Sequence, residues 1–500
     1  MPARPSPPDD DDATISGDFA TLLARDAARE EAREEARAET AEAEALAPAL
    51  RVLAALLPRY GTLGANSPRR AVESLVGEID RALAAQVNLV LHHPELQQIE
   101  ATWRGLRFLL AGAGGDADVK VRVLDIGKRD LARTLRKFRG TAWDQSPLFK
   151  KIYEEEFGQF GGEPYGVLVG DYAFDHRPED VALLADMAQI AAACHAPFLA
   201  AAAASLMQMD SWAELANPRD LTRIFQTPEY AAWRALRAAE DTRYLGLVMP
   251  RFLARLPYGP RTDPVDDFAF EEAVEGADAG AYLWANAAYA FAANIARAFA
   301  LYGWCTRIRG VDSGGIVEGL AVLRFPTADG AVDTRSVTEI ALSERREAEL
   351  AQSGLIPLLY RKNSDVAAFI SAQSLQAPRA YDDPAATANA VLAARLPYLF
   401  ACCRFAHYLK CMVRDKVGSA ITRAALQAWL EEWLLGYVDG SPGTSSEAWK
   451  ATHPLEDASV VLEEREGVPG QYEARFFLRP HYQLEGLTVM LRLLSRVPAP

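Results

Sequence analysis

Residues 165–206 read YGVLVGDYAFDHRPEDVALLADMAQIAAACHAPFLAAAAASL. An apolar run is followed by an Ala-rich segment that opens with Arg-Pro-Glu-Asp, and then by a second apolar run. Because strands buried on both faces carry continuous apolar runs, this order predicts two parallel strands joined by a right-handed helical crossover. We therefore expect a mixed fold, α+β or α/β, with a partly parallel sheet that is covered on both faces.

The residues around this unit predict more helices and strands. Helices are expected over 68–91 and from Pro94 to the glycines near 112. Alternating or apolar runs predict strands, and these lie at 119–127, 243–249, 315–325 and 355–362. The sequence thus predicts a multi-domain protein, since 500 residues exceed one ordinary core.

Changes in composition divide the chain into four parts. We expect a disordered acidic tail at 1–17, an N-terminal helical arm at 18–58, a main α/β domain at 59–379 and a C-terminal domain at 380–500. The last part begins with helical stretches at 384–417 and 421–435. It ends in three strand-like runs, ASVVLEERE, GQYEARFFLRP and GLTVMLRLLSRV.

The arm has an apolar stripe in an otherwise polar helix. Residues 1–45 carry 13 acidic and 5 basic side chains, so much of the net charge of −15 belongs to this end of the chain. Leu50, Leu53 and Leu57 follow at helical spacing. An arm of this kind has little core of its own, so we expect these leucines to dock on a partner.

A second candidate interface lies in the strand-rich C-terminal region. In GQYEARFFLRP, Tyr472 and Phe476 fall on one face of a strand, and Arg475 and Phe477 fall on the other. A strand with an apolar face and an unpaired edge can accept a strand from another chain. We expect these four residues to contribute to such a joint.

Charge and hydropathy exclude several classes of protein. A net charge of −15 argues against nucleic acid as a partner. The most apolar stretch, 281–305, contains Asn286, Asn294 and Arg297, which favours a helix buried in protein over a membrane span. The first residues do not resemble a secretory signal, and the cysteine count of five is odd. Together these observations predict a cytoplasmic protein with reduced thiols.

No nucleotide or metal motif is convincing. The sequence lacks G-x-x-x-x-G-K-[ST], and Gly310, Gly314 and Gly315 are explained by a turn between strands. Cys403, His407 and Cys411 share one helix face, yet no fourth ligand stands at a usual spacing. We therefore expect no cofactor and no metal.

Asp171 is the best enzyme-like position. It ends an apolar strand, where ligands bind in open α/β sheets, and Asp175, His176 and His195 lie close by in sequence. The alternative is that Asp175 and His176 lead into the helix at Pro178. Since no nucleophile motif accompanies these residues, we expect no catalysis.

The segment LHHPELQQIEATWRGLRFLL (91–110) resembles the large sheath subunit of bacterial type VI secretion systems, the TssC or VipB family. The resemblance continues, in order, through EPYGVLVGDYAF (163–174), AEDTRYLGLVMPRFLARLPYG (239–259), YGWCTRIRGVDSGG (302–315) and RPHYQLEGLTVMLRLLSRVP (479–498). It covers the chain from about residue 60 to its end.

The resemblance implies a structural role with several partners. Members pair with a small sheath subunit (TssB or VipA), polymerise into a tube around the Hcp inner tube on a baseplate, and contract to propel that tube. A ClpV-type AAA+ ATPase then dismantles the sheath. Two alternatives remain open on sequence: an α/β enzyme with a site near Asp171, and a sheath protein of a phage-tail-derived particle.

Overall fold

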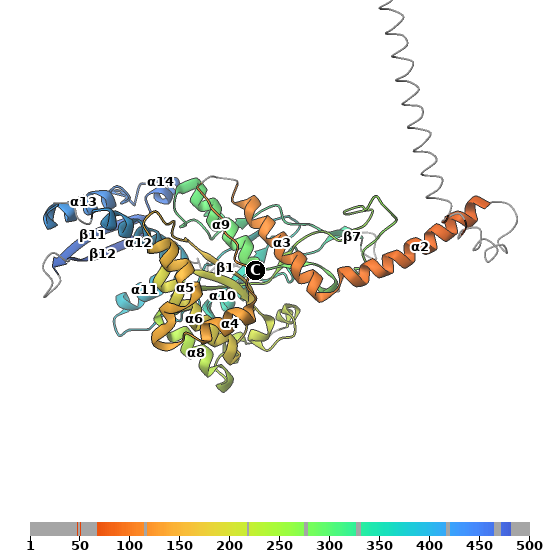
Figure 1. The fold of residues 1–500 in the computed structure, drawn as a ribbon, viewed down its shortest axis with the longest axis horizontal. Helices are drawn as coiled ribbons and strands as arrows, with labels where there is room; N and C mark the ends of the chain where they lie inside the picture. The colour runs from red at the N-terminus through yellow and green to blue at the C-terminus, as the bar shows by residue number, and fades with distance from the viewer. Residues whose placement is uncertain are drawn as a thin grey trace, which may run out of the picture. The chain divides into compact units, whose positions relative to one another are not determined.

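A computed structural model describes residues 48, 51, 68–114, 118–217, 220–274, 279–326, 332–416, 421–464 and 472–481. The chain divides into two units. One comprises Met1–Val87 with Val265–Phe270, and the other Asn88–Pro264 with Glu271–Pro500. The first unit contains most of helix α2 (Pro68–Leu91), drawn in orange in Figure 1, at the position that the sequence predicts.

The second unit is built on a six-stranded sheet. Its strands lie in the order β1-β2-β3-β9-β10-β6, and the pairs from β1 to β9 are parallel, whereas β10 is antiparallel to both β9 and β6. The strands are β1 (Leu168–Phe174), β2 (Phe198–Ala202), β3 (Leu245–Met249), β9 (Leu355–Tyr360), β10 (Ala367–Phe369) and β6 (Ile316–Val317). The predicted mixed fold with a partly parallel sheet is confirmed.

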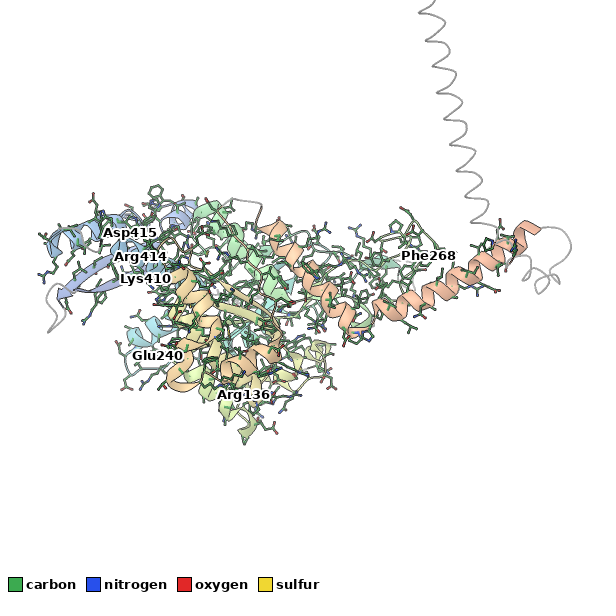
Figure 2. The ribbon with its side chains drawn as sticks, in the orientation of Figure 1. Arg136, Glu240, Phe268, Lys410, Arg414 and Asp415 are labelled. Atoms are coloured by element: carbon green, nitrogen blue, oxygen red, sulfur yellow. The ribbon has the colours of Figure 1, made fainter. Side chains whose placement is uncertain are left out.

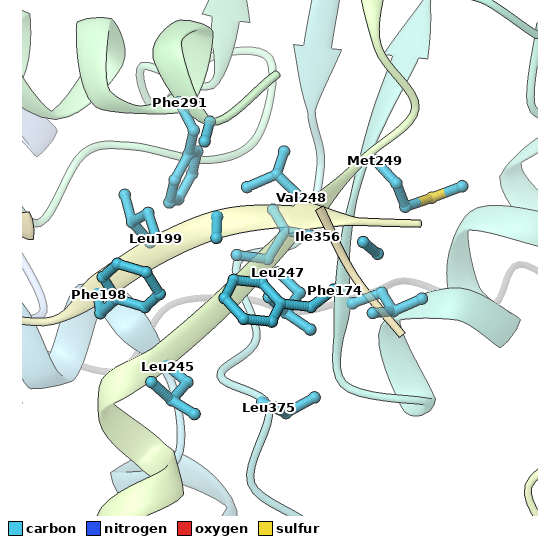
Figure 3. Packing of buried hydrophobic residues seen from close by; sticks show 14 of the residues in the cluster. Phe174, Phe198, Leu199, Leu245, Leu247, Val248, Met249, Phe291, Ile356 and Leu375 are labelled. Carbon is cyan, nitrogen blue, oxygen red and sulfur yellow. The ribbon is translucent and has the colours of Figure 1, made fainter. Parts of the chain in front are cut away.

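Both faces of this sheet are covered. Every residue of β2 and β3 is buried. Helix α6 (Pro178–Cys194) forms the predicted crossover from β1 to β2, and α9 (Ala287–Tyr302) also packs on these strands. Figure 3 shows Phe291 of α9 on one side of the strands and Phe174 and Leu375 on the other. This burial on both faces explains why β2 and β3 contain no residue with a polar side chain.

Helices α3 (Pro94–Gly112) and α9 pack closely because α3 has glycine where they meet. A Cβ atom on Gly105 would lie 2.3 Å from Cδ2 of Tyr289, and one on Gly112 would lie 2.7 Å from Cβ of Ala293. Real Cβ atoms do not approach so closely, so only glycine permits this helix spacing. The contact places α3 beside the β1 edge of the sheet.

The C-terminal region forms its own core. Its elements are α11 (Pro384–Ala393), α12 (Leu396–Lys416), α13 (Arg423–Leu435), α14 (Glu447–Thr452), β11 (Leu455–Glu464) and β12 (Tyr472–Pro480). Nine buried residues form its apolar cluster: Trp304, Phe405, Leu409, Leu430, Leu434, Leu455, Ala458, Val460 and Leu462. Two of the three predicted C-terminal strands are present, and GLTVMLRLLSRV lies outside the described residues.

The remaining elements are short. The helices are α4 (Lys128–Arg136), η2 (Gly140–Gln145), α5 (Pro147–Phe149), η3 (Lys150–Phe157), η4 (Ala204–Met207), η5 (Trp212–Ala216), α7 (Leu221–Ile224), η6 (Pro228–Tyr230), α8 (Ala231–Ala238), η7 (Glu240–Tyr244), η8 (Ala279–Ala281) and α10 (Glu344–Gln352). Besides β11 with β12, the described residues form two more antiparallel pairs outside the large sheet, β4 (Phe252–Leu253) with β5 (Trp284–Ala285) and β7 (Arg324–Pro326) with β8 (Val332–Thr334).

Three expectations for secondary structure are wrong. The strand expected at 315–325 is split into β6 and β7, because Gly319 between them has a φ of +71°, which turns the chain. The helix expected at 384–417 is two helices, since Pro397 occupies the first turn of α12, where proline starts a helix. Residues 119–127 form no strand, because no described backbone pairs with them.

Candidate functional site

The hairpin of β11 and β12 is the candidate interface that the sequence singled out. The two strands are antiparallel, and Val460 faces Phe476 while Ser459 faces Phe477. As period two requires, Ala474, Phe476 and Leu478 pack on the C-terminal core, whereas the side chain of Phe477 points to solvent with 58% of its surface exposed.

Aromatic side chains hold the inner face of the hairpin in place. Trp304 and Phe405 stack with ring centroids 4.3 Å apart, and Tyr437 packs edge-on against Trp304. Because Trp304 follows α9 and Phe405 lies on α12, this stack fixes the hairpin to the helices that cover the large sheet.

The outer face of the hairpin is polar at its margins and apolar at its centre. Arg475 pairs with Glu463 at 3.3 Å, and Arg479 pairs with Glu456 at 3.4 Å. These ion pairs are exposed and contribute little to stability. They flank Phe477, so the exposed aromatic ring is the main apolar feature of this face.

The two long edges of the hairpin differ. The outer edge of β11 is already used, because the backbone N–H of Asp439 donates to the carbonyl of Leu455, and the N–H of Leu462 donates to Oε1 of Gln427. On β12, the hydroxyl of Tyr398 donates to the carbonyl of Leu478 at 3.2 Å, so this carbonyl points away from β11. Residues of a strand alternate in direction, so the backbone groups of Ala474 and Phe476 point outward as well.

Within the described residues, β12 pairs with β11 alone. The outer edge of β12 therefore offers backbone groups to a further strand. Of the residues that the sequence proposed for a partner interface, Arg475, Phe476 and Phe477 lie in this strand. Tyr472 begins it, and its side chain is outside the described part. Leu50, Leu53 and Leu57 are also outside the described residues, so all seven positions stay predictions.

Asp171 joins elements rather than facing a substrate. Its carboxylate accepts hydrogen bonds from Thr102 of α3 at 2.5 Å and from the side-chain amide of Asn286 at 3.2 Å. Asn286 is the N-cap of α9 and also accepts from the N–H of Ala288. Burial raises the pKa of the neighbouring Tyr289, and the Asp171 charge adds to that shift. Asp171 thus ties β1 to two helices.

The other residues near this strand end also have structural partners. Asp175 accepts from the N–H of Arg177 at 2.8 Å, ahead of α6. His176 stacks on Tyr230 with centroids 4.3 Å apart. His195 ends α6 with a φ of +51° and lies edge-on to Phe157. The geometry supports the structural interpretation of these side chains over an acid–base pair.

The His407 face of α12 is buried among aromatic rings. Nε2 of His407 contacts the carbonyl oxygen of Cys194 at 2.9 Å, which requires a proton on that nitrogen. Burial lowers the pKa of His407 to about 4. It also raises the pKa of Cys194 to about 12 and that of Cys403 well above its usual value. Neutral thiols and a donating Nε2 are poor metal ligands.

Lys410, labelled in Figure 2, lies on the same helix. Its ammonium group sits 3.4 Å from the ring centroid of Phe157 and 3.2 Å from the hydroxyl of Tyr153. The contact ties α12 to η3. In the described part of the chain, no group of three or more His, Cys, Asp or Glu side chains is arranged to hold a metal ion.

The glycine turn in RGVDSGG has a steric explanation. Gly314 has a φ of +85°, and a Cβ atom on it would lie 2.2 Å from the carbonyl oxygen of Arg307. The N–H of Gly315 donates to the carbonyl of Gly310 at 2.9 Å. The glycines close a tight turn.

One surface escaped the sequence reasoning. Ile99 and Trp103 on α3 and Val123 and Leu124 in the segment 119–127 are large apolar side chains that remain exposed. Trp103 lies in the motif TWRGL, which carried the family resemblance, and its spacing alone does not say whether it faces the core. The alternation of apolar and polar residues in 119–127 was the sequence signal that could have drawn attention to this surface, because it is typical of a segment that pairs in a sheet.

Among the described helices, none is both long and apolar enough to span a membrane. All five cysteines are free thiols.

Comparisons with known proteins identify the family. Residues 73–376 match the family described as EvpB/VC_A0108, tail sheath N-terminal domain, and residues 385–497 match EvpB/VC_A0108, tail sheath gpW/gp25-like domain. The chain is 62% identical over 456 residues to the "Type VI secretion system sheath protein TssC1" of Pseudomonas aeruginosa, covering 91% of this chain and 92% of that protein.

Among solved structures, a chain of the cryo-EM structure of the anti-feeding prophage baseplate is similar at 11% identity and a TM-score of 0.36, over 76% of this chain and 84% of that one. The two family matches together with the 62% identity decide the assignment. This chain belongs to the VipB family of tail sheath proteins, whose members are structural subunits and not enzymes.

Proposed function

We propose that this protein is the large subunit of a type VI secretion contractile sheath. The observation that carries the proposal is the 62% identity, over nine tenths of both chains, to a protein named as a sheath protein of that system. The match includes both tail sheath domains. Identity at this level over nine tenths of both chains supports the same role for this chain.

In this role the chain pairs with a small sheath subunit of the TssB or VipA type, and the pairs stack in the cytoplasm into a helical tube. The tube grows from a baseplate around an Hcp inner tube and contracts to drive it outward. A separate ClpV-type ATPase dismantles the contracted sheath. The sequence of this chain has no P-loop, which agrees with such a division of labour.

The free edge of β12 supports a role in the lattice. A joint between subunits must survive a large change in their arrangement. Strand addition suits this need because its energy lies in main-chain hydrogen bonds, which keep their geometry when the subunits move as rigid bodies. Phe477 on the exposed face would then pack against the added strand or its neighbour.

The test is co-expression of the full chain with the small sheath subunit of the same operon, followed by affinity purification and electron microscopy. We expect a stable complex and long tubes, and shorter or no tubes when the chain is expressed alone. If the two proteins do not co-purify and no tubes form, the proposed function is wrong.

A further inference from the structure

A cavity of about 740 Å³ lies where the C-terminal region meets the segments that follow α9 and β10. Its walls come from the turn after α9, the start of α12, helix α14 and the base of the β11–β12 hairpin. Sites for small ligands have volumes of roughly 300–1,000 Å³, so this cavity can hold a ligand or a short stretch of peptide.

The charged side chains that line the cavity are mainly basic. Four are cationic and two are carboxylates, which leaves a net charge of +2 with His481 neutral. These six are Arg307, Arg309, Arg395, Lys450, Glu447 and Glu456. Glu447 pairs with Lys450 at 3.4 Å, and Glu456 pairs with Arg479 at the same distance, so both carboxylates already have a basic partner. A basic cavity in a chain of net charge −15 favours an acidic ligand.

Two of the arginines are suited to contact such a ligand. Arg309 is only 7% exposed and acts on a buried carboxyl, since burial raises the pKa of Glu347 and the Arg309 charge lowers it. Arg307 and Arg395 are half-buried. Arg307 donates to the carbonyl of Asp312, which holds its guanidinium in one direction. Partly buried guanidinium groups bind carboxylates more strongly than fully exposed ones, because water screens them less.

The rest of the cavity wall presents proline and tyrosine rings, which are those of Pro397, Pro442, Pro454, Pro480 and Tyr398. The hydroxyl of Tyr398 donates to the carbonyl of Leu478 at 3.2 Å, so the tyrosine ring is fixed at the end of β12. Aromatic surfaces of this kind bind proline-rich peptides, whose extended conformation is largely formed before binding. The cavity therefore combines a surface for prolines with a surface for carboxylates.

One stretch of this chain carries both kinds of residue. Residues 5–12 read PSPPDDDD, so three prolines stand directly before four consecutive aspartates. This stretch lies outside the described residues. Prolines favour an extended chain, which lowers the entropy that a segment loses when it binds a partner. The stretch is thus complementary to the cavity in charge and in its proline content.

We propose that residues 5–12 of one copy bind in the cavity of a neighbouring copy, with the aspartates on Arg307 and Arg395 and the prolines on Tyr398. The contact is between copies because the tube of the proposed function holds many copies side by side. This arrangement raises the effective concentration of the segment at each cavity. In that respect the inference rests on the proposed function.

The first test measures, by fluorescence anisotropy, the binding of a labelled peptide of residues 1–17 to the full-length chain purified with the small subunit. In this chain Asp9–Asp12 are changed to asparagine, so that its own segment does not compete. We expect binding that weakens as the salt concentration rises. A peptide with the same four changes should bind about tenfold more weakly or worse. It leaves the protein untouched, so equal affinity for the two peptides would overturn the proposal.

Substitutions in the cavity give a second readout. Arg307→Glu combined with Arg395→Glu should weaken binding of the wild-type peptide about tenfold or more. A peptide with lysine at all four aspartate positions should then bind this variant, because the charges are exchanged. Arg345→Glu is the matched control, since its side chain is 89% exposed and lies on α10, outside the cavity lining. It should leave the affinity unchanged.

Unchanged affinity of the double variant for the wild-type peptide would contradict the assignment of the two arginines. So would a double variant that keeps the melting temperature of the wild type and does not bind the lysine peptide.

A photo-crosslinking amino acid at Leu392, which lines the cavity, tests the contact in assembled tubes. The tubes are formed with the small subunit from equal amounts of isotopically heavy and light chains. We expect crosslinks to residues 1–17 in which a heavy peptide is joined to a light one. Crosslinks that always join peptides of the same isotope would exclude a contact between copies. Failure of the wild-type chain to bind the small subunit would instead contradict the proposed function, whereas the two peptides decide the inference about the cavity.

Discussion

At the scale of single residues, His407 has the clearest electrostatic consequence. Burial lowers its pKa to about 4, against an ordinary value near 6.5. Between these two values the unfolded chain binds more protons than the folded one. Stability is therefore flat above pH 6.5 with respect to this group, and it falls as pH drops from 6.5 toward 4.

We predict that His407→Gln flattens this pH dependence. Glutamine keeps a donor for the carbonyl of Cys194 but cannot take up a proton. Between pH 7.5 and pH 5 the wild type should lose about 2 kcal/mol more of its unfolding free energy than the variant does. Urea unfolding at both pH values measures this, and parallel pH profiles for the two proteins would refute it.

The same residue bears on metal binding. Since Nε2 of His407 donates to a carbonyl and burial raises the pKa of the Cys403 thiol well above its usual value, we predict less than stoichiometric zinc in the purified protein. Elemental analysis by mass spectrometry measures this. His407→Ala and Cys411→Ala should both leave tube assembly intact. A stoichiometric metal that disappears in these variants would contradict the prediction.

At the scale of elements, strand β12 has backbone N–H groups that point toward β11 and others that point away from it, and a proline substitution has a different effect at each kind of position. The backbone N–H of Arg475 points toward β11, since it alternates with the outward groups of Ala474 and Phe476. Proline at Arg475 therefore breaks the hairpin itself, at a cost of about 3 kcal/mol, and stops tube formation whether or not a partner strand is present.

We predict that Ala474→Pro separates the two effects. Proline there removes only an outward donor, and edge strands tolerate proline on their free side. The hairpin and the heterodimer should survive, whereas long tubes should be lost. Ala474→Val keeps the N–H group and is the control. Electron microscopy of co-expressed protein decides, and abundant full-length tubes with Ala474→Pro would exclude strand addition at this edge.

At the scale of the whole molecule, a contractile lattice needs rigid subunits with linkers between them. The large sheet, buried on both faces, and the aromatic stack on Trp304 supply a rigid block. The free edge of β12 is one candidate linker. The N-terminal arm, which lies outside the described residues apart from single positions, is predicted to be another.

We predict that changing Leu50, Leu53 and Leu57 to aspartate weakens assembly while the body of the protein still folds. Charged side chains cannot occupy an apolar docking site without a large desolvation cost. The control is aspartate at Ala32, Ala36 and Ala43, which adds the same charge to the arm away from the stripe. Sedimentation of tubes from lysates compares the two. Normal tubes with the leucine changes would reduce the arm to a solubility tail.

The sequence by itself determined the parts of this protein whose signals are local. Continuous apolar runs predicted β1 and β2 as parallel strands of a covered sheet, and the apolar stretch 281–305 with its few polar residues predicted a helix buried in protein, which is α9. The period-two pattern predicted the two faces of β12. Each of these predictions concerns whether a side chain is buried. The spacing of apolar residues along the sequence indicates burial, because it follows the period of the helix or strand.

Only the tertiary structure decided where backbone and polar groups find their partners. Residues 119–127 have the alternating pattern of a strand, yet none of the described backbone pairs with them. Asp171 lies at a strand end where a catalytic acid could lie, but its carboxylate oxygens accept hydrogen bonds from Thr102 and Asn286, which are distant from it in sequence. Strand pairing and hydrogen bonding of this kind depend on which distant segments lie side by side in the folded chain, and a local sequence pattern does not specify that.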